Sequence, residues 1–156
     1  MGQKLHGMLP LELMVDHAML DAEHDEIFCR IEAIKESALS AERMPEDEVL
    51  ALADSFARHF ASEEQLAREV GMEFSEHVHE HAQALRMLDK ACDDLRAGGL
   101  DLRSFLRCLE YWFEHHINAF DKPLGRRLAQ RAAGSRGARA GVPGLAARPA
   151  ESRPAV

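Results

Sequence analysis

Apolar residues recur along most of the chain at the three- and four-residue spacing of an amphipathic helix. Four segments show this period, and none alternates as a β-strand does. The first runs from about residue 16 to 40, the second from Pro45 to near Gly71, the third from about residue 74 to 97, and the fourth starts at Asp101. Helices of about 20–25 residues joined by short loops predict an all-α fold, an up-down-up-down four-helix bundle.

Local signals support these ends. Pro45 followed by the acids at 46–48 is typical of a helix start, because negative charge suits the N-terminal end of the helix dipole. The glycines at 98–99 stop the third helix. Pro123 is expected to break or bend the fourth helix, since it lacks an N–H, and residues 123–131 to restart only as a short turn.

The composition changes near Ala132. Residues 132–156 are mostly Ala, Gly, Pro and Arg and offer little to bury, so we predict a disordered tail after a bundle domain of residues 1–131. The tail holds four Arg and one Glu, a net charge of +3, which leaves −11 on the bundle out of −8 for the whole chain.

Charge and composition exclude several classes of protein. A net charge of −8 argues against a nucleic-acid partner, which would need a basic face. The chain has no apolar run long enough for a signal peptide or a membrane span, so we expect a cytoplasmic protein that does not bind membranes. The three cysteines form no CxxC or CxxCH motif, which gives no support to a zinc ribbon or covalent haem.

Polar residues that interrupt the apolar stripes carry the chemical signal. In "HVHEH", His77 and His81 lie four apart, about 40° around a helix, whereas His79 points the other way. Asp121 follows His116 by five, about 140° around an ideal helix, and would face inward only if the helix is distorted near Pro123. The full set of inward-facing polar residues is His24, His59, Glu63, His77, His81, His116 and Asp121.

A metal centre explains such a set. Burying this many ionisable groups without partners would cost several kcal/mol each, and that cost disappears when each group is a ligand. Five imidazoles and two carboxylates exceed the needs of one four-coordinate zinc and suit two octahedral ions that share bridging carboxylates. Mixed imidazole and carboxylate ligands favour iron or manganese, although ligand type alone leaves zinc and copper open.

Four motifs resemble those of the hemerythrin family in its bacterial branch. They are "DAEH" (21–24), "HFASEE" (59–64), "HVHEH" (77–81) and "WFEHHINAFD" (112–121). The family pattern in this order is D-x-[EQ]-H, H-F-x-x-E-E, H-x-x-x-H and W-[LF]-x-x-H-I-x-x-x-D, and the match spans about residues 9–124. The resemblance implies a four-helix bundle that binds O2 reversibly at two iron ions (Fe2+/Fe3+) with an oxo or hydroxo bridge.

The resemblance also implies roles for the seven residues. His77, His81 and His116 would bind one iron, and His24 and His59 the other. Glu63 and Asp121 would bridge the two irons, and the two-histidine iron would keep an open position for O2. Beside these ligands, Glu64 is expected to be a surface group or to orient a histidine N–H. Trp112 and Phe113 are expected to belong to the core, with the lining of the O2 pocket as the alternative.

The sequence departs from the family pattern without losing a ligand. Leu9 stands where a Trp is usual, Asp16 where a Gly is usual, and Ala67 where a Met is usual. The segment between Glu63 and His77 is one residue shorter than expected and lacks the usual Tyr-Pro. The shorter loop is expected to affect where the third helix starts.

The function most consistent with this sequence is O2 binding, as a carrier, a store or the input of a sensor. The alternatives are a di-iron oxidase, peroxidase or nitric oxide reductase, and an iron storage or repair protein. Ferritin-like di-iron enzymes use two Glu-x-x-His motifs and two more Glu. This chain has one such motif, from Glu76 to His79, with its histidine on the wrong face. A histidine-rich site therefore favours binding over catalysis.

Overall fold

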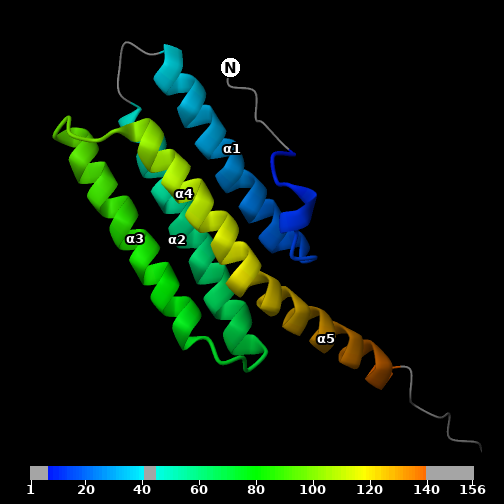
Figure 1. The fold of residues 1–156 in the computed structure, drawn as a ribbon. Helices are drawn as coiled ribbons and strands as arrows, with labels where there is room; N and C mark the ends of the chain where they lie inside the picture. The colour runs from blue at the N-terminus through cyan, green and yellow to red at the C-terminus, as the bar shows by residue number, and fades with distance from the viewer. Residues whose placement is uncertain (1–6, 41–44, 140–156) are drawn as a thin grey trace, which may run out of the picture.

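The computed structural model describes residues 7–40 and 45–139 and confirms the prediction of an all-α four-helix bundle (Figure 1). The bundle helices are α1 (Ala18–Ser40), α2 (Glu46–Glu69), α3 (Ser75–Arg96) and α4 (Leu102–His116). A 3-10 turn, η1 (Leu11–Leu13), precedes them, and a π-helical turn, η2 (Ile117–Asp121), and α5 (Lys122–Arg139) follow.

The four helices enclose one core. α1 packs against α2 and α4, and α3 against α2 and α4, so each helix has two neighbours and the ring closes. Each helix turns one apolar stripe inward, as α1 does with Leu20, Ile27, Ile31 and Ile34, all of which are buried. His24 lies on the same stripe and is also buried. The polar residues of interest therefore lie within the core.

An N-terminal arm, residues 7–15, is fastened to α1. The carboxylate of Asp25 accepts hydrogen bonds from the backbone N–H groups of residues 7–9, and that of Asp21 accepts one from Val15 at 2.8 Å. Leu13 and Val15 are buried in the core. Two acids that flank His24 in sequence thus hold the arm beside the start of α1.

The junction between α4 and α5 is distorted just before Pro123, but it corrects the prediction that residues 123–131 restart only as a short turn. The N–H of Lys122 bonds to the carbonyl of Ile117, five residues back, as in a π-helix. The extra residue in this turn distorts the helix just before Pro123, and α5 then continues in the same run. A proline in the first turn of a helix is well tolerated, so no break is needed.

The prediction of disorder from residue 132 is wrong at its start, because α5 is helical to Arg139. Strong helix formers, Ala, Arg, Gln and Leu, occupy every position from 126 to 133 and outweigh the glycines at 134 and 137 that follow. Residues 129–139 are exposed, and α5 extends beyond the end of the bundle (Figure 1). The rest of the predicted tail, residues 140–156, lies outside the described residues.

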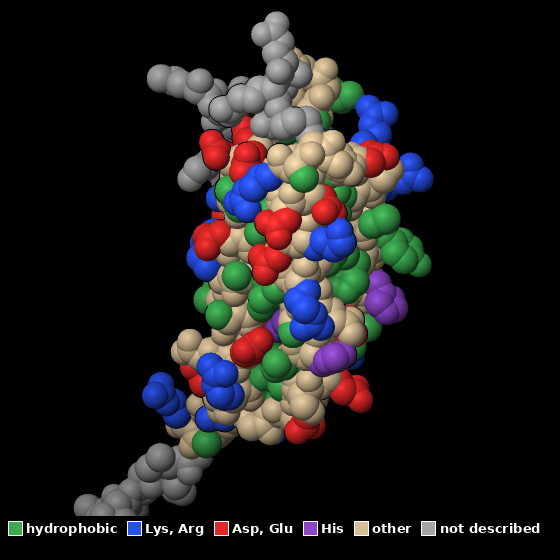
Figure 2. Space-filling view, turned by 90° about the vertical axis from the view of Figure 1, so that its left-hand side faces the viewer, with side chains coloured by type: hydrophobic (Ala, Val, Ile, Leu, Met, Phe, Trp, Pro, Cys, Tyr) green, Lys and Arg blue, Asp and Glu red, His purple; other side chains and the backbone are tan. Residues whose placement is uncertain are grey.

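The surface carries mixed charge. On the face in Figure 2, Lys and Arg side chains alternate with Asp and Glu side chains along the bundle. Within residues 7–40 and 45–139, no helix has the length and apolar character needed to cross a membrane.

Candidate metal centre

The structure brings all seven predicted residues together inside the bundle. Each is buried, and every bundle helix contributes: His24 from α1, His59 and Glu63 from α2, His77 and His81 from α3, His116 from α4 and Asp121 from η2. His79 and His115 are exposed, as their helical register predicts. The seven residues form two groups of possible metal ligands that share Glu63.

One half of the centre holds three imidazoles. The Nε2 atoms of His77 and His116 lie 3.0 Å apart, and Nε2 of His81 lies 3.0 Å from Oε2 of Glu63. The other half holds two imidazoles, with the Nε2 atoms of His24 and His59 3.0 Å apart. All five rings therefore turn the same nitrogen, Nε2, toward the centre.

Asp121 divides its two oxygens between the halves. Oδ1 lies 2.9 Å from Nε2 of His77 and 3.0 Å from Nε2 of His116, while Oδ2 lies 3.1 Å from Nε2 of His24. A carboxylate with one oxygen in each half has the placement required of a bridging ligand.

Glu63 divides its oxygens in the same way. Oε2 faces the three-histidine half, 3.0 Å from Nε2 of His81 and 3.4 Å from Nε2 of His77. Oε1 faces the other half, 3.6 Å from Nε2 of His59. The two carboxylates thus join the halves from two different elements, α2 and η2.

The orphaned polar atoms of the centre show that the donor set fits metal ions. Oε1 of Glu63 and both carboxylate oxygens of Asp121 are buried and have no hydrogen-bond partner with acceptable geometry among the described residues. Buried polar atoms are nearly always satisfied, so each orphan requires an explanation. Cations placed between the converging nitrogens and oxygens would satisfy all of them.

The electrostatics favour the ligand form of the histidines. Burial lowers the pKa of His81 to about 2, with further lowering by the positive charge that His77 and His116 would carry. Burial also lowers the pKa values of His59 and His77. Imidazoles with lowered pKa values stay neutral at pH 7, and a neutral imidazole presents the lone pair that a metal needs.

The pKa values of the two carboxylates shift in opposite directions. Burial, reinforced by the nearby charge of Asp121, raises the pKa of Glu63 well above its ordinary value. Burial would also raise the pKa of Asp121, but its contacts with His116, His24 and His77 lower that pKa well below its usual range. Without metal, the pair thus avoids holding two negative charges, whereas bound cations would stabilise both.

The π-helical turn explains how Asp121 reaches the centre. In a regular α-helix, residues 116 and 121 would lie about 140° apart, on different faces. The i→i+5 bonding of η2 widens the turn and brings Asp121 into the core beside His116, where both residues are fully buried. π-helical turns within longer helices are frequently found at functional sites.

Two further carboxylates hold histidines from behind. Nδ1 of His59 lies 2.8 Å from Oε2 of Glu23, and Nδ1 of His81 lies 3.1 Å from Oε1 of Glu64. A carboxylate at Nδ1 fixes the ring and leaves Nε2 unprotonated for a metal. The role predicted for Glu64 agrees with this contact.

Glu23 was missed in the sequence analysis. Its contact is with a histidine on another helix, so spacing along the chain does not reveal it. The available signal was the Glu or Gln at this position of the D-x-[EQ]-H motif, since either residue offers an oxygen acceptor.

Aromatic rings surround the centre and differ between its halves. Phe113 meets the rings of His24 and His59 edge-on, with centroids 5.4 and 6.2 Å away. Trp112 instead stacks on His116 at 4.7 Å. Phe113 therefore contacts both histidines of the two-histidine half, and Trp112 contacts the three-histidine half.

Comparisons of the chain with protein-family models, with curated proteins and with solved structures give no match. What the chain itself shows is a four-helix bundle with a buried cluster of His, Glu and Asp that could hold metal ions.

Proposed function

We propose that this protein binds O2 at a non-haem di-iron centre, as the resemblance to hemerythrins implies. The observation that carries the proposal is the unequal division of the ligands: three imidazoles in one half, two in the other, and two carboxylates with an oxygen in each. Neither a structural zinc site nor a carboxylate-rich di-iron site would have this composition.

The two halves of the centre offer different numbers of ligand donors. An octahedral ion takes about six donors. Three imidazoles, two carboxylate oxygens and one oxo or hydroxo group would supply six donors to an ion in the first half. Two imidazoles with the same three oxygen donors leave the second half one donor short, which would give O2 a position beside His24 and His59. Two ferrous ions bound here would supply the electrons that O2 accepts on binding and returns on release.

The side chains around the two-histidine half would favour reversible binding. Phe113 lies against both histidines and packs on Phe28 and Phe56, with ring centroids 5.2 and 5.0 Å away. These rings exclude water from that half. Glu23 is on the Nδ1 side of His59, facing away from the centre, and so is badly placed to give a proton to a bound molecule.

The test is to load the protein with ferrous iron without air, titrate it with O2 and then lower the O2 pressure. A colour that appears on oxygenation and disappears on deoxygenation over several cycles would support O2 binding. Irreversible oxidation with release of hydrogen peroxide would instead favour an oxidase. Iron that leaves readily to a weak chelator, without a reversible colour, would favour storage.

A further inference from the structure

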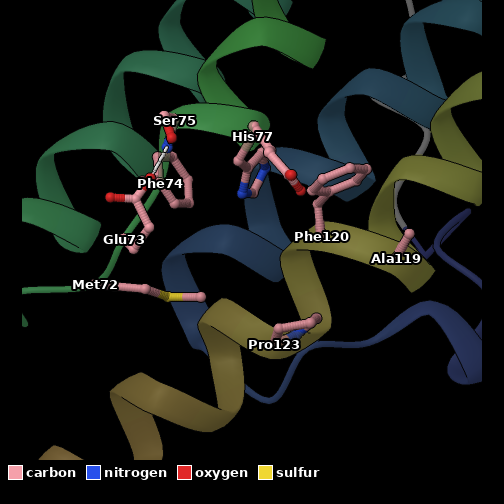
Figure 3. Close-up of a pocket in the computed structure, with 9 residues that line it drawn as sticks. Met72, Glu73, Phe74, Ser75, His77, Ala119, Phe120 and Pro123 are labelled. Atoms are coloured by element: carbon pink, nitrogen blue, oxygen red, sulfur yellow. Dashed lines mark hydrogen bonds between the residues drawn. The ribbon is translucent and has the colours of Figure 1, made fainter.

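A pocket of about 320 Å³ lies where the α2–α3 loop meets the α4–α5 junction. Its walls include Met72, Glu73 and Phe74 on one side and Ala119, Phe120 and Pro123 on the other (Figure 3). Glu76 also lines it. The loop is the one that is shorter than the family pattern. The pocket thus lies at a feature particular to this chain.

The pocket reaches the metal centre through His77. This residue lines the pocket, and its Nε2 is also 2.9 Å from Oδ1 of Asp121 within the centre. Of the five central histidines, His77 has the largest exposed fraction, 4%, and its Nδ1 has no hydrogen-bond partner among the described residues. Its ring is therefore more than nine-tenths buried and borders both the centre and the pocket.

Aromatic rings frame this position. The ring centroid of Phe74 lies 4.0 Å from that of His77, and the centroid of Phe120 lies 5.2 Å away. In Figure 3 the two rings flank the imidazole. The Nδ1 atoms of His59 and His81 instead contact the carboxylates of Glu23 and Glu64.

The mouth of the pocket is acidic. Glu73 and Glu76 line it, and Glu76 and Glu80 line an adjoining hollow with His79. Hydrogen bonds from the Ser75 hydroxyl and backbone N–H lower the pKa of Glu73 and keep it ionised. The N-terminus of α3 contributes only about half a positive charge here, which the carboxylates outweigh.

We propose that this pocket is the route by which hydrated divalent metal ions reach and leave the centre. Glu73 and Glu76 attract the cation at the mouth, and His77 is the first centre ligand it meets. This inference rests on the proposed metal centre but not on O2 binding. It assigns a role to carboxylates that do not belong to the seven ligands.

The test measures how fast Fe2+ leaves the loaded, reduced protein to an excess of a coloured chelator, and how fast Fe2+ enters the metal-depleted protein. Glu73→Gln with Glu76→Gln should slow both rates, by about tenfold at low ionic strength and less at high salt. Glutamine still offers an oxygen to Ser75, so the start of α3 is preserved. Ala119→Leu narrows the pocket and should slow both rates at any salt concentration.

The matched control is Asp89→Asn with Asp93→Asn. This variant changes the net charge by the same amount, and its two sites lie on α3 about 20 Å or more from Glu76. Both residues are exposed, and this variant should exchange metal like the parent. Parent-like rates in the Glu73/Glu76 and Ala119 variants would overturn the proposed route. Failure of the parent to bind two metal ions would overturn the centre instead, so the two failures can be told apart.

Discussion

Replacing Glu63 with Gln should have opposite effects on the metal-free and the metal-loaded protein. Glu63 is fully buried, its Oε1 has no hydrogen-bond partner within the described part of the chain, and burial together with Asp121 raises its pKa. In the metal-free protein the amide removes a titratable group from beside Asp121 and can donate hydrogen bonds to neighbouring imidazoles. In the loaded protein the same change removes a bridging anion.

The expected change in the stability of the metal-free protein follows from the cost of leaving a buried carboxylate oxygen without a partner. An unsatisfied buried polar atom costs about 1–3 kcal/mol. Oε1 of Glu63 would then cost the metal-free protein about 1–3 kcal/mol, a substantial part of a typical stability of about 5–15 kcal/mol. Glu63→Gln should recover about 1–3 kcal/mol, which raises the melting temperature by about 2–10 °C. Metal at a thousand times its Kd should stabilise the parent by about 4 kcal/mol.

The assay is thermal unfolding followed by far-ultraviolet circular dichroism, with chelator and with iron, together with the iron content per chain. Glu63→Gln should melt higher than the parent in chelator, gain little from iron and bind fewer than two irons. The control is Glu64→Gln, which retains an oxygen for Nδ1 of His81 and should load like the parent. A Glu63→Gln protein that binds two irons and is stabilised by them as the parent is would refute the bridging role.

Three further predictions concern stability. In denaturant titrations of the metal-free protein, the free energy of unfolding should fall below about pH 6.5. Histidines in the unfolded chain bind protons there, whereas His81 in the folded protein, with a pKa of about 2, does not. His81 alone accounts for a loss of about 2 kcal/mol at pH 5. The lowered pKa values of His59 and His77 act in the same direction, whereas the raised pKa of Glu63 lets the folded protein bind one proton and so opposes them. A free energy of unfolding that is the same at pH 7 and pH 5 would contradict this prediction. Gly125→Ala should lower the free energy of unfolding by about 1–3 kcal/mol, because the added Cβ would clash with the carbonyl oxygen of Val15. A melting temperature equal to that of the parent would show that the N-terminal arm can move aside at little cost. Asp16→Gly should raise the free energy of unfolding by about 0.5–1 kcal/mol, because Asp16 has a φ of 59°, a left-handed conformation that glycine adopts without strain. A lower melting temperature of this variant would mean that the aspartate is not strained.

The helices and their inward faces could be predicted because a 3.6-residue period determines both. His77 and His79 differ only in register, and the register places the first in the core and the second on the surface. Even the distortion at Asp121 was foreseeable, because a residue five after His116 cannot share its face in a regular helix.

Features that depend on contacts between distant segments could not be predicted in this way. Glu23 holds a histidine on α2, and Asp21 and Asp25 hold the N-terminal arm, through pairings that no local pattern encodes. The continuation of α5 past Pro123 was missed for a different reason. The π-helical turn removes the conflict that a proline normally creates inside a helix.

O2 binding at a di-iron centre is tested by iron analysis combined with O2 titration of the parent protein, loaded with ferrous iron in the absence of air. We predict two irons per chain, one O2 taken up for each pair of irons, and full recovery of the deoxygenated spectrum when O2 is removed. One iron per chain, a preference for zinc in competition, or hydrogen peroxide released in proportion to O2 consumed would contradict it.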